Sequence, residues 1–416
     1  MANITSCRED SDEILSHGKW SVENFKEANS TMEGQFKVFW TAMNCNYPIW
    51  DYEAEFGVDW DAVYKEYLPV FREADRKHRD ENTIMPDSVF HKKYEKIISL
   101  LHDGHTFLYI KNLHTGALHH FSPSVTRLLE REDWESEYDF KPKTSYYESE
   151  AVNEDERIVE TVKASDVYQY ARFKDGIVYL RMKDCNFPNH FNEAAVEYSS
   201  MASTQARLVW RKWFDAIQEL HGKNTLKGVV IDVRGNGGGP TEISQYVFGA
   251  LHNNRYPNSN AYQRGYIRMK NGIGRLDFFP KVPWLWTMCK ENHADIHEPI
   301  VVLANYITAS GAEHICLDAK EMPNACVIGT NTCGALSPLS EKLDSLYYVG
   351  CIGKAGETSF YMDIPSAAFM TDEGDFLEGK GVMPDIEVKQ DLDLFLSTGR
   401  DKQLERALEF IRNKNF

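Results

Sequence analysis

The segment LANYITASGAEHICLDA (303–319) places a serine where carbonyl chemistry could occur. A buried strand is expected to end there and a helix to begin near Ser310. The free N–H groups and the dipole of a helix N-terminus favour an oxyanion, and the amide of Gly311 can donate to one. The segment predicts a nucleophile at Ser310. The alternative is a simple N-cap serine, which is the commoner role at such a position.

A second segment, VVIDVRGNGGGP (229–240), runs from an apolar strand into four glycines between Gly235 and Gly239. Without Cβ atoms, such a turn exposes backbone N–H groups to an anion or a developing oxyanion. Pro240 breaks a dinucleotide fingerprint, and a P-loop would need a Lys and a Ser or Thr that are absent. The alternative is a tight turn without a ligand. Asp232 and Arg234 are expected to be structural and to tie the strand end to the turn.

The third segment is LLHDGHTFLYI (100–110), in which His105 follows a helix end and precedes a strand. A lone histidine is more often structural than catalytic. With an ordinary pKa of about 6.5, however, His105 could take a proton from a serine at neutral pH.

Taken together, the motifs DVRGNGGG, TASGAE and GKGVMPD (379–385), in this order, resemble the tail-specific or carboxy-terminal processing serine peptidases. The resemblance is strongest over residues 170–416, and LHDGHT extends it towards the N-terminus. It implies a ClpP/crotonase-like core. It also implies a nucleophile at Ser310, with oxyanion donors at Gly311 and at Gly239 or Gly238.

The base implied by the resemblance is that of the tricorn-like branch. In the lysine-dependent branch a Lys follows the nucleophile in a turn, but the matching turn TNTCGALS has Ala335 there. The tricorn-like LxDxHT motif instead places the base on His105, and a late carboxylate that steadies it on Glu378. A solvated surface carboxylate is the alternative for Glu378. That branch can carry a serine just before the histidine, where this chain has Gly104, so a fourth catalytic residue is left open.

The elements needed to position these residues predict an α/β fold with a mixed, partly parallel sheet and covering helices. We expect an N-terminal segment at 1–10, a helical region at 11–110, an acidic excursion at 111–165 and the peptidase core at 166–416. Asp59 is expected to cap a helix. Strands are predicted at 175–184, 226–235, 298–305 and 325–329, and helices at 189–222, 310–321 and 402–413.

Composition excludes several classes of function. With 46 basic and 63 acidic residues the net charge is -17, and no basic cluster suits nucleic acid. No apolar stretch is long enough to span a membrane. The eight cysteines show no metal-ligand spacing, so neither a metal nor a cofactor is expected. Ile4 to Cys7 (ITSC) resemble the end of a bacterial lipoprotein signal and point to a lipid anchor at Cys7 in the cell envelope; an accidental tetrad in a cytoplasmic protein is the alternative.

The expected activity is endoproteolysis of unfolded tails or short peptides through an acyl-enzyme on Ser310. One rival is a non-catalytic module that binds apolar ligands or peptides on the same core, as the resemblance to interphotoreceptor retinoid-binding proteins implies. The 22 Phe, 21 Tyr and 9 Trp could line such a pocket. A second rival is an esterase or amidase with the same triad. The sequence does not fix specificity or oligomeric state.

Overall fold

The computed structural model describes residues 25–123, 155–165, 167–186, 201–241, 243–251, 261–272, 274–287, 294–339, 347–348 and 351–413. The chain divides into two compact units. The first comprises Met1–Glu130, Gly265–Pro283 and Ser337–Gly379, and the second Arg131–Arg264, Trp284–Leu336 and Lys380–Phe416. Each unit has its own hydrophobic core. Cys7, part of the acidic excursion and the start of the helix predicted at 189–222 lie outside the described residues.

The first unit contains the helices α2 (Met32–Asn46), α3 (Trp50–Glu55), α4 (Trp60–Glu81) and α5 (Asp87–Ile98). The predicted cap of α4 is confirmed, because the Asp59 side chain accepts a hydrogen bond from the amide of Ala62 at 3.0 Å. Val63, Tyr67 and Phe71 recur at helical spacing along α4 and are buried. One apolar face of α4 therefore belongs to the core.

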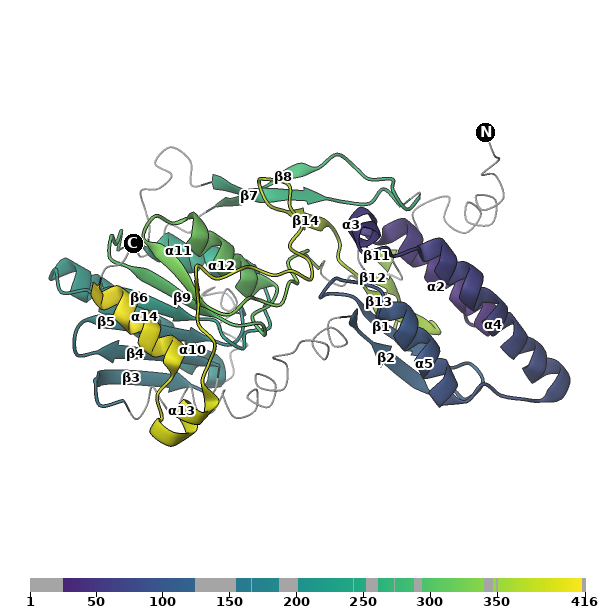
Figure 1. Cartoon of the computed structure of the whole chain (residues 1–416), viewed down its shortest axis with the longest axis horizontal. Helices are drawn as coiled ribbons and strands as arrows, with labels where there is room; N and C mark the ends of the chain where they lie inside the picture. Colours follow the sequence, from purple (N-terminus) through teal and green to yellow (C-terminus); the bar gives the residue numbers. More distant parts are fainter. Residues whose placement is uncertain are drawn as a thin grey trace. The chain divides into compact units, whose positions relative to one another are not determined.

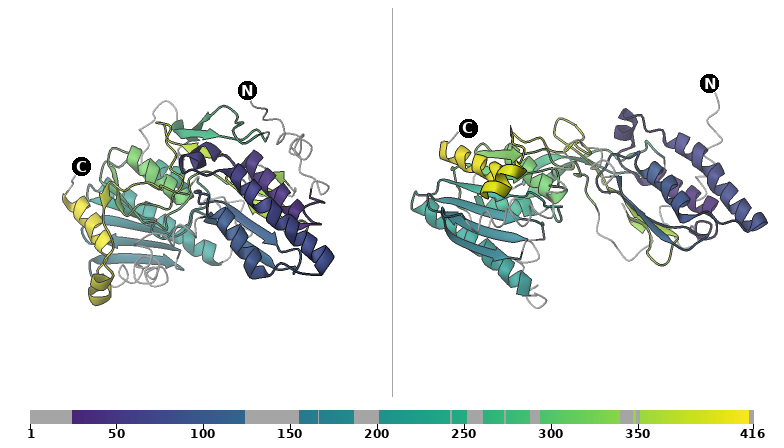
Figure 2. Two further views of the ribbon diagram at one scale, coloured as in Figure 1. Left: turned by 45° about the vertical axis from the view of Figure 1, so that its right-hand side comes forward. Right: turned by 60° about the horizontal axis from the view of Figure 1, so that its bottom comes forward.

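The sheet of the first unit is antiparallel, in the order β11 (Tyr347–Tyr348), β12 (Cys351–Gly353), β13 (Phe360–Asp363), β1 (Phe107–Lys111) and β2 (Leu118–Phe121). Figure 2 shows the helices of this unit beside the sheet. Aromatic side chains join the two layers; for example, Phe39 of α2 meets Phe360 of β13 edge to face at 6.2 Å. Strand β1 begins two residues after His105, so this layer fixes the histidine loop at one end.

The second unit is built on a seven-stranded mixed sheet. Its order is β15 (Ile386–Glu387), β10 (Ala325–Gly329), β9 (Ile300–Ala304), β6 (Gly228–Asp232), β5 (Ile177–Met182), β4 (Tyr168–Phe173) and β3 (Ile158–Ala164). The pairs from β15 to β5 are parallel, whereas β5, β4 and β3 are antiparallel. Every residue of β5, β6 and β9 is buried, as expected for strands covered on both faces. The predicted fold class is confirmed.

Among the residues that the structure describes in this unit, the helices are α10 (Met201–Gly222), α11 (Ile243–Leu251), α12 (Gly311–Glu321), α13 (Leu392–Thr398) and α14 (Lys402–Asn413). Figure 1 shows α14 lying along the sheet. Leu404, Leu408 and Ile411 of α14 share a core with Val230 and Val301 of the central strands. The C-terminal amphipathic helix is thus a layer of the second unit.

A third, three-stranded sheet has the order β14 (Ala368–Met370), β7 (Ala261–Arg268) and β8 (Val282–Thr287). β14 and β7 are antiparallel, with Ala368 opposite Arg268. Two of the boundaries between the units fall inside β7 and β8.

Candidate active site

The glycine turn and the serine segment leave the same edge of the second unit's sheet. Strands β6 and β9 are parallel neighbours, so the chain that follows each of them starts at one end of the sheet. The amide of Ala309 donates to the carbonyl of Asn236 at 2.9 Å, and the Thr308 hydroxyl donates to the carbonyl of Val233 at 2.9 Å. These bonds fasten the two segments to each other.

Two glycines allow the backbones to approach closely at this edge. A Cβ atom on Gly238 would lie 2.5 Å from the Cβ of Ser310 and 2.7 Å from the carbonyl oxygen of Ala309. A Cβ atom on Gly311 would lie 2.5 Å from the carbonyl oxygen of Gly239. All three distances are shorter than contacts of a real Cβ atom allow. Glycine is therefore required at these two positions, and the turn packs directly on Ser310.

Ser310 has an unusual backbone conformation, with φ 54° and ψ -124°. An ordinary N-cap residue is extended, and a non-glycine residue with positive φ is strained. The side chain is partly exposed. Ser310 is the N-cap of α12 and forms a capping box with Glu313, and its strained backbone is in addition the arrangement expected of a nucleophile.

The backbone amides around Ser310 differ in their hydrogen bonds. The amide of Gly238 donates to the side-chain oxygen of Asn236 at 2.8 Å. Within the described part of the chain, the amides of Gly239 and Gly311 donate to no acceptor. Of the two candidates in the turn, Gly239 therefore has its N–H available, whereas that of Gly238 is engaged.

Glu313, one turn into α12, anchors the Ser310 segment from the interior. Its fully buried carboxylate accepts hydrogen bonds from the Ser310 amide at 2.9 Å, the Thr332 hydroxyl at 2.6 Å and the amides of Gly334 and Ala335, each at 2.7 Å. Burial raises its pKa to about 6, although these donors oppose the shift. The turn TNTCGALS, which corresponds to the Lys-bearing turn of the lysine-dependent branch, is thus connected to Ser310 through the carboxylate of Glu313.

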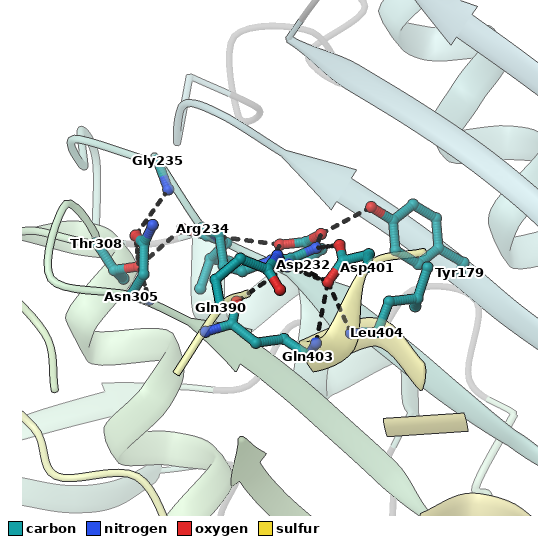
Figure 3. A network of polar contacts seen from close by, with 11 residues as sticks. Tyr179, Asp232, Arg234, Gly235, Asn305, Thr308, Gln390, Asp401, Gln403 and Leu404 are labelled. Carbon is teal, nitrogen blue, oxygen red and sulfur yellow. Dashed lines mark hydrogen bonds and ion pairs between the residues drawn. The ribbon is translucent and has the colours of Figure 1, made fainter. Parts of the chain in front are cut away.

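A buried polar network holds the base of the glycine turn (Figure 3). The guanidinium of Arg234 binds both oxygens of Asp232, at 2.9 and 2.6 Å, and reaches Asp401 and Gln403 at 3.0 Å each. Burial alone would raise the pKa of Asp232, but Arg234 lowers it overall. The side-chain oxygen of Asn305 accepts the amide of Gly235 at 3.0 Å. Asp232 and Arg234 are structural, as expected from the sequence.

His105 lies in the first unit, in the loop between α5 and β1. Asp103 fixes this loop by accepting the amides of His105 at 2.8 Å and Thr106 at 2.5 Å. The His105 side chain is almost completely buried, and burial lowers its pKa below the usual value. Asp103 and a hydrogen bond with the backbone of Ser337 oppose this effect.

Glu378 also lies in the first unit and is fully buried, so the alternative of a solvated surface carboxylate is wrong. One of its carboxylate oxygens accepts the amide of Ser337, and its carbonyl accepts the hydroxyl of Tyr52 at 2.6 Å. The backbone of the same Ser337 also acts to raise the pKa of His105, so the two side chains have this residue as a common neighbour.

The described structure therefore groups the predicted residues in two sets. The second unit brings together Ser310, Gly311, Gly238 and Gly239, and the first brings His105 to Glu378 through Ser337. Sequence reasoning gave no role to Glu313 or Ser337. For Glu313 a signal was present, because a Glu three residues after a serine is a capping-box pattern. Ser337 carries no local signal.

A mixed sheet with a strained serine at a helix start, against a glycine turn, is an arrangement that suits serine hydrolase chemistry. Residues 192–388 match the sequence model of Peptidase family S41. This part of the chain therefore resembles a Peptidase family S41 domain, and the predicted resemblance to the tail-specific and carboxy-terminal processing serine peptidases is confirmed.

The chain is also similar to individual proteins in sequence or in fold. Carboxy-terminal processing protease CtpA of Bacillus subtilis (strain 168) is 26% identical over 214 residues, which are 51% of this chain and 37% of that protein. The chain thus spans little more than a third of this relative's length. A protein from Parabacteroides merdae ATCC 43184, provisionally assigned as a peptidase, superposes with a TM-score of 0.61 at 19% identity, covering 92% of this chain and 97% of that one. Mature CPAF superposes with a TM-score of 0.57 at 10% identity, covering 94% and 99%.

Two further observations concern the described residues alone. They contain no helix that combines the length and the apolar character needed to cross a bilayer. They also contain no group of three or more His, Cys, Asp or Glu side chains arranged to hold a metal ion.

Proposed function

We propose that this chain is a serine endopeptidase that forms an acyl-enzyme on Ser310. The hydroxyl of Ser310 attacks the carbonyl carbon of a peptide, and the tetrahedral intermediate forms beside the start of α12. Its oxyanion accepts hydrogen bonds from the amides of Gly311 and Gly239, where charge develops in the transition state. Water then releases the acyl group.

His105 is proposed as the general base, as in the tricorn-like branch. It accepts the proton of Ser310 and returns it to the leaving amine. Because burial lowers its pKa, the imidazole is neutral at physiological pH and ready to accept a proton. Glu378 steadies the ring through the Ser337 segment and favours its charged form. We propose that Ser337, whose amide donates to Glu378, supplies the link between base and carboxylate, in the role left open by Gly104.

The observation that carries the proposal is the geometry at Ser310. The positive φ of Ser310 costs free energy. Ser310 also lies so close to Gly238 that no side chain fits at position 238. A module that only binds apolar ligands has no physical use for either feature. The S41 match over residues 192–388 gives independent support.

Covalent labelling with a fluorophosphonate tests the nucleophile. Folded protein should be labelled at Ser310 near pH 8, and Ser310→Ala should abolish labelling, whereas Ser397→Ala on the exposed face of α13 should not. Absence of labelling in folded wild-type protein would leave the rival reading, a binding module on the same core. Comparing turnover of a peptide with that of a matched ester separates a peptidase from an esterase.

The role of His105 has its own test. His105→Ala should remove peptide turnover while circular dichroism and thermal unfolding show a folded protein. His297→Ala, at an exposed histidine of the second unit, is the matched control and should retain turnover. Unchanged activity in His105→Ala would assign the proton transfer to another group.

Unfolded tails or short peptides are the proposed substrates, since an extended chain exposes its carbonyls to such a site. We also propose a location in the bacterial cell envelope with a lipid anchor at Cys7. Detergent phase partitioning of the full chain made in its native host, compared with Cys7→Ser, tests the anchor. Equal partitioning of both proteins into the aqueous phase would refute it.

A further inference from the structure

Asn236 is a completely buried residue at the centre of the glycine turn, and it binds the chain on both sides of the turn. Its Oδ1 accepts the amide of Gly238 at 2.8 Å, and its Nδ2 donates to the carbonyl of Met182 at 3.2 Å. Its backbone amide donates to the carbonyl of Val233 at 3.1 Å, and its carbonyl accepts the amide of Ala309 at 2.9 Å. One residue therefore joins the end of β5, the glycine turn and the segment that precedes α12.

The orientation of the Asn236 side-chain amide follows from its partners. A backbone amide can only donate and a backbone carbonyl can only accept, so Oδ1 faces Gly238 and Nδ2 faces Met182. The thiol of Cys185 donates a weaker hydrogen bond to the same Oδ1, with Sγ 3.7 Å away. The reversed orientation would set donors against donors and acceptors against acceptors.

The hydrogen bond to Oδ1 restrains the peptide unit on one side of Gly238, and a second bond restrains the unit on the other side. The carbonyl of Gly238 and the N–H of Gly239 belong to one planar trans peptide unit, so they point in opposite directions. This carbonyl accepts the amide of Cys185 at 3.1 Å, which directs the N–H of Gly239 away from Cys185. Together with the bond to Asn236, it fixes both peptide units that meet at Gly238.

The N–H of Gly239 that is directed in this way lies next to the second proposed donor. A Cβ atom on Gly311 would lie 3.4 Å from the backbone nitrogen of Gly239. Gly239 is exposed, so a substrate can reach its backbone. The turn therefore offers an incoming oxygen an N–H whose direction is set by neighbouring groups.

The glycines make such a restraint necessary. Gly237, Gly238 and Gly239 have no Cβ atoms, so the peptide units between them rotate more freely than those of other residues. A larger residue cannot replace Gly238, because its Cβ would overlap with that of Ser310. A donor that stabilises a transition state must point at the developing charge before the reaction starts. The restraint must therefore come from a side chain outside these three glycines, and Asn236 supplies one.

We propose that Asn236 is a positioning residue for the reaction. Its side-chain amide holds the peptide units at Gly238, so that the N–H of Gly239 points at the oxyanion of the tetrahedral intermediate. The inference rests on the proposed acyl-enzyme on Ser310. It adds a buried amide to the groups that determine the rate of acylation, beside the nucleophile, the base and the two donors.

Two substitutions at position 236 separate the two ends of the amide. Asn236→Leu has nearly the same shape and removes both side-chain hydrogen bonds. Asn236→Ser removes the donor to Met182, but a serine hydroxyl can accept the amide two residues later, as in an ST turn. Asn324→Leu is the matched control, since it removes an amide that donates to the carbonyl of Glu298 at 2.8 Å. Glu298 precedes β9, whereas Ser310 follows the opposite end of this strand.

The maximal rate of fluorophosphonate labelling measures oxyanion stabilisation, because negative charge develops on the phosphoryl oxygen as Ser310 attacks. In Asn236→Leu this rate should fall by about 10²-fold, as expected when one oxyanion donor is misdirected. The probe concentration that gives half the maximal rate should change little, since binding before the reaction does not use this N–H. Asn236→Ser should recover most of the rate, and Asn324→Leu should retain all of it.

Turnover of unfolded β-casein should divide in the same way, with a lower kcat and an almost unchanged KM in Asn236→Leu. The pH dependence of labelling should be the same in all variants, because the base is not altered. A purely structural role predicts a different result. If Asn236→Leu loses stability but labels as fast as Asn324→Leu, the inference is overturned and the proposed function stands. Absence of labelling in the unaltered protein would refute the proposed function, and the role of Asn236 in the reaction with it.

Amide hydrogen exchange followed by NMR gives a test that needs no substitution. The amide of Gly238 should exchange slowly because it donates to the buried Oδ1 of Asn236, whereas that of the exposed Gly239 should exchange fast. Fast exchange of both amides in the unaltered protein would overturn the inference, whether or not Asn236→Leu folds.

Discussion

Adding a single methyl group at Gly238 should separate the geometry of the nucleophile from the rest of the fold. Gly238 has φ 98°, and its added Cβ would overlap with the Cβ of Ser310 at 2.5 Å. The left-handed backbone alone costs an alanine about 1 to 2 kcal/mol. Overpacking adds about 1 to 3 kcal/mol if the turn stays in place. Gly238→Ala should therefore be destabilised by about 2 to 5 kcal/mol, or the turn should move.

Movement of the turn would shift the amide of Gly239 away from the oxyanion, and loss of one such donor lowers the rate by about 10² to 10³-fold. Peptide turnover and the rate of fluorophosphonate labelling should both fall in Gly238→Ala, and the midpoint of urea unfolding should decrease. Gly237→Ala is the matched control. Its Cβ would meet no atom within 4 Å, and its φ is not positive.

The comparison between the two neighbouring glycines decides the outcome. Gly237→Ala should keep its stability within about 0.5 kcal/mol of the unaltered protein. Turnover in Gly238→Ala equal to that in Gly237→Ala would refute the argument that the glycine turn is shaped against Ser310. A large loss in both variants would point instead to general sensitivity of the loop.

Three other outcomes follow from the buried charges. Activity should be lost as the pH falls through the lowered pKa of His105, below about 6.5, whereas an ascending limb well above pH 8 would indicate a lysine base. Burial raises the folded-state pKa of Glu313 from 4.5 to about 6. The free energy of unfolding should therefore decrease by about 2 kcal/mol as the pH rises from below 4.5 to above 6. Urea unfolding of Glu313→Gln should lack this change. Asp401→Ala removes one carboxylate from the buried Arg234 and should lower the free energy of unfolding in urea by about 3 to 5 kcal/mol. Asp393→Ala, at an exposed position, should lower it little. Equal urea midpoints of the two variants would contradict a stabilising role of the Arg234 network.

The parts of the fold that follow from local pattern could be predicted from the sequence. The apolar runs of β5, β6, β9 and β10 and the periodicity of α14 are strong signals because burial imposes them directly. The order of the strands and the pairing of β4 and β3 with β5 required the structure, since antiparallel partners leave no distinct mark on a fully buried strand.

The candidate site shows the same division. Ser310 and the glycine turn were found because a strand end, a helix start and a run of glycines each have a local signature. Other contacts join distant parts of the chain. Tyr47 binds Asp103 and Glu53 binds His102 in the loop that carries His105, and Ser337 binds Glu378; each pair is 41 or more positions apart. No periodicity or motif encodes such meetings, because they depend on how helices pack on a sheet. Assignment of the base therefore came from family resemblance.

The hydrogen bonds of Arg234 to Asp401 and Gln403 also determine when the glycine turn beside Ser310 can be stabilised during synthesis. Asp401 and Gln403 leave the ribosome 167 and 169 positions after Arg234. Until they arrive, the guanidinium of Arg234 beneath the glycine turn lacks two of its hydrogen-bond acceptors, and buried donors without acceptors are costly. A nascent or prematurely terminated copy that stops short of Asp401 thus lacks part of the scaffold under the glycine turn, so the proposed oxyanion site can be complete only after Asp401 and Gln403 have been made.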